Sequence, residues 1–218
     1  MSVKKIVVLG PESTGKSTLC TQLAAHYHTT WVPEYAREFL EKKGTQYTCD
    51  DLLLIAKGQL NSEDEILDEV SGSRFQVSGS QQSAISSRQN AEGSEQKVDC
   101  DITHRTSNIV HPTSHFPHVF IDTDMYVMKV WSEFVFNNCN TWILNQIANR
   151  SYDGYLLCDV DLPWEKDALR EYPDLKVREK LYHFYKEHLT SQQTPWCEIN
   201  GNYEERLQKA IKFVNYLK

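Results

Sequence analysis

Eight residues near the N-terminus have the types and the spacing of a phosphate-binding loop. Residues 10–17 read GPESTGKS and match G-x-x-x-x-G-K-[ST] at every fixed position. In such a loop, backbone N–H groups surround a β-phosphate, and glycines allow conformations that side chains would block. Lys16 would reach the β- and γ-phosphates, and the Ser17 hydroxyl would bind Mg²⁺. We therefore expect an Mg-ATP site whose contacts are Gly10, Glu12, Ser13, Thr14, Gly15, Lys16, Ser17 and Thr18.

The sequence on either side of this phosphate loop (residues 10–17) supports the assignment. Residues 6–9, IVVL, form a continuous apolar run, as expected of a strand buried on both faces of a parallel sheet. An amphipathic helix is predicted from residue 16 to about residue 27, and its N-terminal dipole would face the same phosphate. The alternative is a chance match in a loop containing glycine and serine, which would not require this strand and helix.

Three carboxylates follow predicted strands and are candidates for the chemistry of phosphate transfer. Asp122 ends the apolar run 119–122, VFID, which is the usual form of the second Mg²⁺ element in such proteins. Asp124 lies past the strand end and could contact a substrate, cap the next helix, or do both. Glu34 follows a short predicted strand at 31–32. It is either a general base that orients the acceptor hydroxyl or a first-turn acid favoured by the helix dipole.

Basic side chains later in the chain could close over the phosphates. Arg170 and Arg178 lie in a charged stretch after the fourth predicted strand, where small-molecule kinases with this loop commonly bring arginines onto the phosphates. Such a charge would stabilise the transition state, and the closing lid would exclude water. The alternative is surface salt bridging, worth at most about 1 kcal/mol per pair. Arg37, one helical turn after Glu34, either clamps the substrate or pairs with Glu34 or Glu41.

The elements that position these residues alternate between strands and helices. This alternation predicts an α/β fold, a doubly wound parallel five-stranded sheet with its ligand at the carboxyl ends of the strands. Strands are predicted at residues 6–9, 31–32, 118–121, 155–158 and 196–199. Helices are predicted at residues 16–27, 34–43, 50–67, 125–136, 141–149, 165–171, 176–189 and 203–217.

Residues 71–117 differ in composition from the rest of the chain. Ser, Gln, Gly and Asn dominate there, and aromatic residues nearly vanish. Such a segment has too little apolar surface to offset its ordering entropy, so we predict a flexible insertion. The chain of 218 residues otherwise suits one domain, residues 1–218, with a sizeable core.

The composition also limits the class of protein. The net charge is -7, which argues against a sequence-independent nucleic-acid partner, since such proteins need a basic surface. Six cysteines are scattered without a CxxC pair, which is typical of reduced thiols in the cytoplasm. No apolar run approaches the ~20 residues of a membrane span. We therefore expect a cytoplasmic protein with no membrane contact and a small-molecule partner.

Six blocks of sequence occur in an order that is specific to one family. They are GPESTGKSTL at 10–19, WVPEYAREFL at 31–40, IAKGQ at 55–59 followed by Glu63-Asp64, FIDTDMYVMKVWSE at 120–133, YLLCDVDLPWEKDALRE at 155–171 and INGNYEERLQKAI at 199–211. Together they resemble the ribosylnicotinamide kinase domain of the bacterial NadR family of NAD-biosynthesis proteins. The phosphate loop alone is widespread, whereas the combination of PEYAR, DTD and DxPWxxDxxR is far more specific.

This resemblance implies transfer of the ATP γ-phosphate to the 5′-hydroxyl of nicotinamide riboside, giving nicotinamide mononucleotide. Its nicotinamide ring is cationic, so aromatic faces would attract it and carboxylates would complement it. Trp164 and Tyr35 could instead be packing residues, and the adenine-contacting loop at Asn200-Gly201 could be a plain turn. The implied nucleoside contacts are Glu34, Tyr35, Arg37, Asp124, Tyr126, Trp164 and Asp167. Together with the arguments above, we expect Lys16, Glu34, Asp122 and Arg170 to be catalytic and Arg178 to bind the nucleotide.

Two departures from the family keep other functions open. NadR proteins carry further domains ahead of this one, whereas this chain begins just before its first predicted strand, so we expect neither adenylyltransferase nor DNA-binding activity. The segment 71–117 is longer than the family's usual link. A kinase for another nucleoside or nucleotide, or a regulatory ATP-binding switch that uses this segment to bind a partner, would also fit the phosphate loop.

Overall fold

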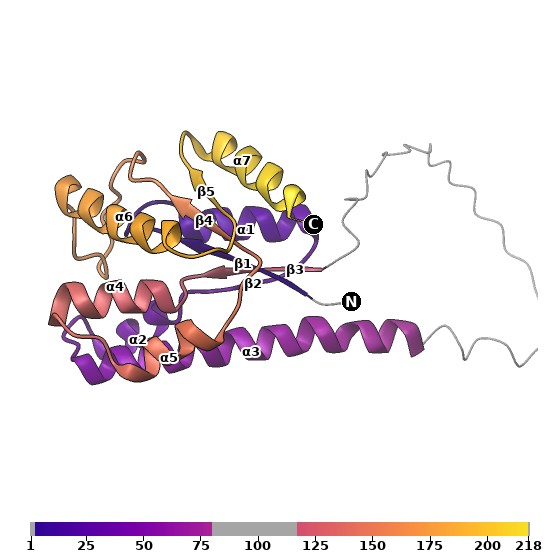
Figure 1. Cartoon of the computed structure of the whole chain (residues 1–218), viewed down its shortest axis with the longest axis horizontal. Coiled ribbons are helices and arrows are strands. Elements are labelled where there is room, and N and C mark those ends of the chain that lie inside the picture. Colours follow the sequence, from indigo (N-terminus) through magenta and orange to yellow (C-terminus); the bar gives the residue numbers. More distant parts are fainter. Residues whose placement is uncertain (1–2, 80–116, 218) are drawn as a thin grey trace, which may run out of the picture.

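Parallel strands form one five-stranded sheet in the computed structural model, which describes residues 3–79 and 117–217 (Figure 1). The strands are β1 (Lys4–Leu9), β2 (Trp31–Val32), β3 (His118–Asp122), β4 (Gly154–Cys158) and β5 (Trp196–Ile199), in the order β2-β3-β1-β4-β5. The central strand, β1, pairs with β3 on one side and β4 on the other. The phosphate loop therefore leaves the sheet where the strand order switches direction, which is where ligands bind in such folds. The predicted fold class is confirmed.

Helices cover both faces of this sheet (Figure 1). They are α1 (Lys16–Tyr27), α2 (Tyr35–Lys43), α3 (Cys49–Gly79), α4 (Met125–Phe136), α5 (Thr141–Asn149), α6 (Leu175–Thr190) and α7 (Tyr203–Tyr216). One buried cluster joins the sheet to α1 and α7, and a second joins its other face to α4 and α6. A third cluster packs α2, α3 and α5 against α4.

The apolar run of β1 faces both layers. Ile6 and Val8 belong to the cluster beneath α1 and α7, while Val7 and Leu9 belong to the opposite one. All four side chains are fully buried. Successive strand residues point to opposite faces, so only an uninterrupted apolar run can fill both.

Two predictions about helices were wrong. Helix α3 continues to Gly79, beyond the predicted end at residue 67, and so overlaps the first residues of the predicted insertion. The reason is that Ile66, Leu67 and Val70 still pack against the sheet cluster. The rest of that predicted insertion, residues 80–116, lies outside the described residues.

The second error concerns residues 165–171, where a helix was predicted. Residues 159–174, which we call the lid loop, contain neither helix nor strand. Their backbone N–H groups bond instead to side chains of the phosphate loop, namely Ser13 and Glu12.

Membrane contact and thiol state were also predicted from the sequence. Among the described helices, none is both long and apolar enough to cross a bilayer. The cysteines in the described part of the chain are free thiols, as expected: Cys20, Cys49, Cys139, Cys158 and Cys197.

Candidate active site

The phosphate loop connects β1 to α1 in a conformation that requires glycine at two positions. Gly10 has φ +146° and Gly15 has φ +76°. A Cβ atom at Gly10 would lie 2.6 Å from the carbonyl oxygen of Cys158, so the loop packs directly on the end of β4. Lys16 Nζ donates to the carbonyl oxygen of Pro11 at 3.1 Å. This single contact leaves the ammonium able to turn toward an incoming phosphate.

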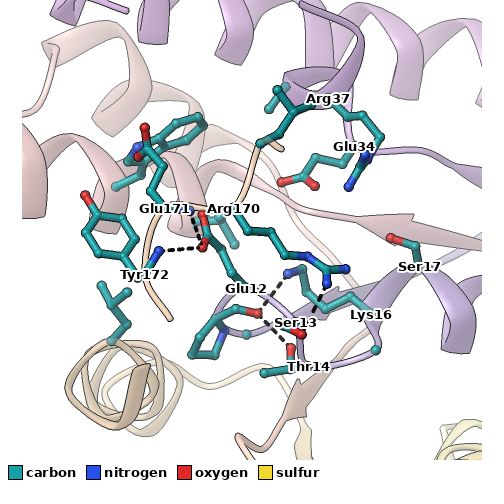
Figure 2. A pocket seen from close by; sticks show the side chains of 18 of the residues that line it. Glu12, Ser13, Thr14, Lys16, Ser17, Glu34, Arg37, Arg170, Glu171 and Tyr172 are labelled. Atoms are coloured by element: carbon teal, nitrogen blue, oxygen red, sulfur yellow. Dashed lines mark hydrogen bonds between the residues drawn. The ribbon is translucent and has the colours of Figure 1, made fainter. Parts of the chain in front are cut away.

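A pocket opens above this loop, and its walls come from four other parts of the chain (Figure 2). The loop residues 10–17 and Thr18 line one end of the pocket. Arg170 approaches that end from the lid loop. Away from the loop, the walls include Glu34, Arg37, Trp131, Phe134, Tyr172 and Tyr185. A polar, cationic phosphate end thus meets a wall rich in aromatic rings, none of which the sequence analysis named.

Ser17 and Asp122 meet at the carboxyl ends of β1 and β3. Ser17 Oγ donates to Asp122 Oδ2 at 2.5 Å. The Asp122 side chain is fully buried, and its other oxygen, Oδ1, has no hydrogen-bond partner among the described residues. Burial raises the pKa of this carboxyl to about 6; Lys16 opposes the rise and Glu34 adds to it. Burial therefore outweighs the attraction between the carboxylate and Lys16.

This pair fits the requirements of Mg²⁺. A hydroxyl and a carboxylate are the oxygen ligands the ion prefers, and it usually keeps several waters and binds substrate phosphates rather than a full protein cage. No group of three or more His, Cys, Asp or Glu suited to a metal occurs within residues 3–79 and 117–217, which is consistent with such a sparse site. The unpartnered Oδ1 of Asp122 offers the free ligand position.

Glu34 lies at the N-cap of α2, but its carboxylate caps no N–H group of that helix. It lines the pocket and accepts a long hydrogen bond, 3.4 Å, from Thr123 Oγ1. Thr123 has φ +77°, a strained value for a β-branched residue. The carboxylate of Glu34 thus lies in the pocket wall and does not cap the helix, and its role as a general base stays a prediction.

Gln59 of α3 braces this region and was missed as a functional residue. Its side chain is almost fully buried. It donates to the carbonyl oxygens of Pro33 (3.3 Å) and Asp122 (3.1 Å) and accepts from the Tyr35 N–H (2.8 Å). These bonds fix the turn bearing Glu34 against the end of β3.

The lid loop is fastened to the phosphate loop by side chains (Figure 2). Ser13 Oγ accepts from the Glu165 N–H at 3.0 Å and from Arg170 Nη1 at 3.3 Å. Glu12 Oε2 accepts from the N–H groups of Glu171 (2.9 Å) and Tyr172 (3.1 Å). Arg170 is therefore held beside the phosphate loop, where the sequence predicted it.

Two further predicted residues hold the outer side of the lid loop. Arg37 Nη2 pairs with Asp167 Oδ2 at 2.9 Å. This hydrogen bond raises the pKa of the guanidinium and contributes to lowering that of the carboxyl. Arg37 lines the pocket, whereas Asp167 lies outside the lining and contacts it only through this ion pair with Arg37.

Arg178 and Trp164 pack together. The Arg178 guanidinium lies 5.3 Å from the centroid of the Trp164 ring, and Arg170 lies 6.0 Å from it. Arg178 is 3% exposed, and its Nε and Nη1 atoms have no hydrogen-bond partner among the described residues. Burial lowers its pKa. A buried guanidinium with unused donors suits an anion.

Five predicted nucleoside contacts lie outside the pocket lining: Trp164 and Asp167, described above, and Tyr35, Asp124 and Tyr126. Asp124 caps α4, accepting from the Tyr126 N–H at 3.0 Å and the Val127 N–H at 3.3 Å. Burial raises its pKa to about 7. Tyr126 stacks on His188, with the ring centroids 5.7 Å apart. The Tyr35 ring packs so closely on helix α3 that a Cβ atom at Gly58 would meet it at 2.1 Å. Their role in nucleoside binding stays a prediction.

The turn at Asn200-Gly201 is joined to the phosphate loop by Arg206, a second residue that was missed. Arg206 is 2% exposed. It donates to the carbonyl oxygens of Gly201 (2.8 Å), Thr14 (2.9 Å) and Asp159 (3.1 Å), and it pairs with Asp161. One buried side chain thus ties together the phosphate loop, the lid loop and α7.

A parallel sheet with a phosphate loop at its switch point defines this chain as a P-loop α/β protein with the nucleoside-kinase fold. Its sequence matches the AAA domain family over residues 5–78 and 84–206, so the chain belongs to that family. None of the curated proteins matches it significantly.

Solved structures extend this comparison at the level of the fold. A NadR protein in complex with NR has a TM-score of 0.65 at 18% identity, and the match covers 99% of this chain and 49% of that one. The chain thus spans about half the length of that protein. Thymidylate kinase from Ehrlichia chaffeensis has a TM-score of 0.56 at 13% identity, covering 98% of this chain and 99% of that one. Deoxyadenosine kinase from M. mycoides has a TM-score of 0.53 at 10% identity, covering 98% and 100%.

Proposed function

We propose that this protein is an ATP-dependent kinase that phosphorylates the 5′-hydroxyl of nicotinamide riboside to give nicotinamide mononucleotide. One observation carries the proposal: the phosphate loop and Arg170 face, across one pocket, a wall formed by the Glu34 carboxylate and aromatic rings. Phosphoryl transfer needs mainly positioning and charge neutralisation, and this arrangement can supply both.

The phosphate end supplies the positive charge. The N–H groups of the phosphate loop hold the β-phosphate, and Lys16 exchanges its bond to the Pro11 carbonyl for the γ-phosphate. Arg170 neutralises charge that develops on the transferred group. Arg178 lies outside the pocket lining, but its buried guanidinium has unused donors that could bind a further phosphate oxygen. Ser17 and Asp122 hold Mg²⁺, which neutralises phosphate charge when bound.

The acceptor end recognises the nucleoside. Glu34 accepts the hydrogen bond of the attacking hydroxyl and orients it toward the γ-phosphate, and Arg37 lies beside it in the lining. A cationic nicotinamide ring is attracted to aromatic faces, and Trp131, Phe134 and Tyr172 provide them here. Trp164 is a weaker candidate than the sequence indicated, because the guanidinium groups of Arg178 and Arg170 lie against its ring.

A second candidate is phosphorylation of another nucleoside or of a nucleotide. Its support is the fold shared with thymidylate kinase and deoxyadenosine kinase. A regulatory ATP-binding switch is disfavoured, because a switch has no need of a second wall with a carboxylate placed opposite the phosphate loop.

The deciding experiment measures ADP release from Mg-ATP with and without nicotinamide riboside, with the product identified by mass. A panel of deoxynucleosides and thymidylate runs in parallel. We expect release that depends on the riboside and falls at least about a hundredfold in Lys16→Ala. Release stimulated by a deoxynucleoside and not by the riboside would move the assignment to the second candidate. ATP binding without stimulation by any acceptor would refute the kinase proposal.

A further inference from the structure

A glutamate in a loop that binds phosphates needs a physical reason, because a carboxylate repels the anion that the loop is built to hold. Glu12 occupies the third position of the phosphate loop. Its carboxylate turns to the lid loop, where Oε2 accepts from two successive N–H groups, those of Glu171 and Tyr172 (Figure 2). The geometry gives this side chain a partner other than the nucleotide.

We propose that Glu12 is a positioning residue, which anchors the lid loop to the phosphate loop and so fixes Arg170 over the transferred phosphate. This inference rests on the proposed kinase function for its kinetic consequences. It replaces the prediction that Glu12 contacts the nucleotide.

The contact between Glu12 and the lid loop is an anion bound by backbone N–H groups. Two consecutive N–H groups that converge on one oxygen make a small anion-binding nest, and charge-assisted hydrogen bonds are stronger than neutral ones. Arg170 directly precedes the two donors in the chain. Its own guanidinium donates to Ser13, the neighbour of Glu12, at 3.3 Å. Two adjacent residues of the phosphate loop therefore hold both the backbone and the guanidinium of the segment at 170–172.

The lid loop depends on such contacts because residues 159–174 contain no helix or strand. Without Glu12, the N–H groups of Glu171 and Tyr172 would have to bond to water. Burial raises the pKa of Glu12, while the N–H groups of Tyr172 and Glu171 oppose that rise, which agrees with a carboxylate held between the two loops. Tyr47 adds an outer contact by donating to Glu171 Oε2 at 2.7 Å.

The first test measures hydrogen–deuterium exchange of the Glu171 and Tyr172 amides in the nucleotide-free protein. Glu12→Ala is expected to speed their exchange about tenfold or more, and Glu12→Gln, which keeps one acceptor oxygen, to give a smaller increase. Glu38→Ala, an exposed glutamate that pairs with Lys42, is the matched control and leaves these amides unchanged. Unchanged exchange in Glu12→Ala would overturn the proposal.

The second test separates anchoring from nucleotide contact. Glu12→Ala is expected to lower kcat about tenfold, with a smaller change in the KM for ATP. In a protein that already carries Arg170→Ala, adding Glu12→Ala is expected to lower kcat no further. A rise in the KM for ATP alone, additive with Arg170→Ala, would make Glu12 a nucleotide ligand and contradict the inference. If no acceptor is phosphorylated, the kinase proposal fails, and the exchange experiment still decides whether Glu12 anchors the lid loop.

Discussion

Replacing Asp122 by asparagine should remove a pH-dependent penalty from the stability of the free protein while it impairs catalysis. The carboxyl of Asp122 is fully buried, and burial raises its pKa from 3.8 to about 6. The folded state therefore binds this proton more tightly than the unfolded chain does. The free energy of unfolding consequently falls as the pH rises from about 4 to about 6, and the full penalty is present above that range.

The size of the effect follows from the two pKa values. Their difference corresponds to about 3 kcal/mol of unfolding free energy once Asp122 is fully ionised. Asparagine does not titrate, so this pH-dependent penalty disappears. Its amide N–H₂ would have no hydrogen-bond partner at the position of Oδ1, which costs about 1–3 kcal/mol at every pH. The change with pH of the stability difference between the two proteins is therefore the quantity to measure. Relative to the wild type, Asp122→Asn should gain about 2 kcal/mol between about pH 4 and about pH 8.

Urea unfolding followed by tryptophan fluorescence at several pH values measures this difference. Asp68→Asn, an exposed carboxylate on α3, is the matched control for the loss of one charge. A difference between wild type and Asp122→Asn that stays constant with pH would refute the reasoning that burial destabilises the charged carboxylate. In the kinase assay the same variant should lose at least about a hundredfold in rate, because it weakens the Mg²⁺ site.

Two other buried side chains give predictions for stability. Arg206→Ala should lower the free energy of unfolding by about 3 kcal/mol, since Asp161 and three carbonyl oxygens lose their donor; a loss below about 1 kcal/mol in urea unfolding would contradict this. Gln59→Leu should cost about 1–3 kcal/mol in the same assay, because three backbone groups lose their side-chain partner, one of them in a buried hydrogen bond. It should also reduce the kinase rate more than the ATP affinity, because the turn bearing Glu34 loosens; an unchanged rate would show that this brace is structural alone.

The parts of the site that the sequence could predict are those set by local spacing. The phosphate loop is one continuous motif between a buried strand and a helix, so residues 10–17 were assigned from the chain alone. Asp122 and Glu34 followed from the rule that parallel strands bring their carboxyl ends to one edge. Each of these inferences uses only the type of the residue and its position relative to the neighbouring strand or helix.

The residues that were missed or misplaced depend on contacts between distant segments. Arg206 and Gln59 bond to backbone that is far away in sequence, for example Arg206 to Thr14, and no local pattern encodes such a pair. Tyr126 stacks on His188, a contact between distant residues that the local sequence does not reveal, and its role in nucleoside binding stays a prediction. The helix predicted at 165–171 does not form, and the Glu171 N–H that would bond within it is bonded instead to the distant Glu12.

Burial disfavours the charged form of two side chains, Asp122 and Arg178. Asp122 is a buried acid whose pKa is raised, and Arg178 is a buried base whose pKa is lowered. Both have polar atoms without hydrogen-bond partners among the described residues. A cation bound at the acid and an anion bound at the base would relieve both penalties, and Mg²⁺ bound to a triphosphate supplies the two charges together. Under the proposed kinase function, this ligand would offset the free-energy cost of burying both groups.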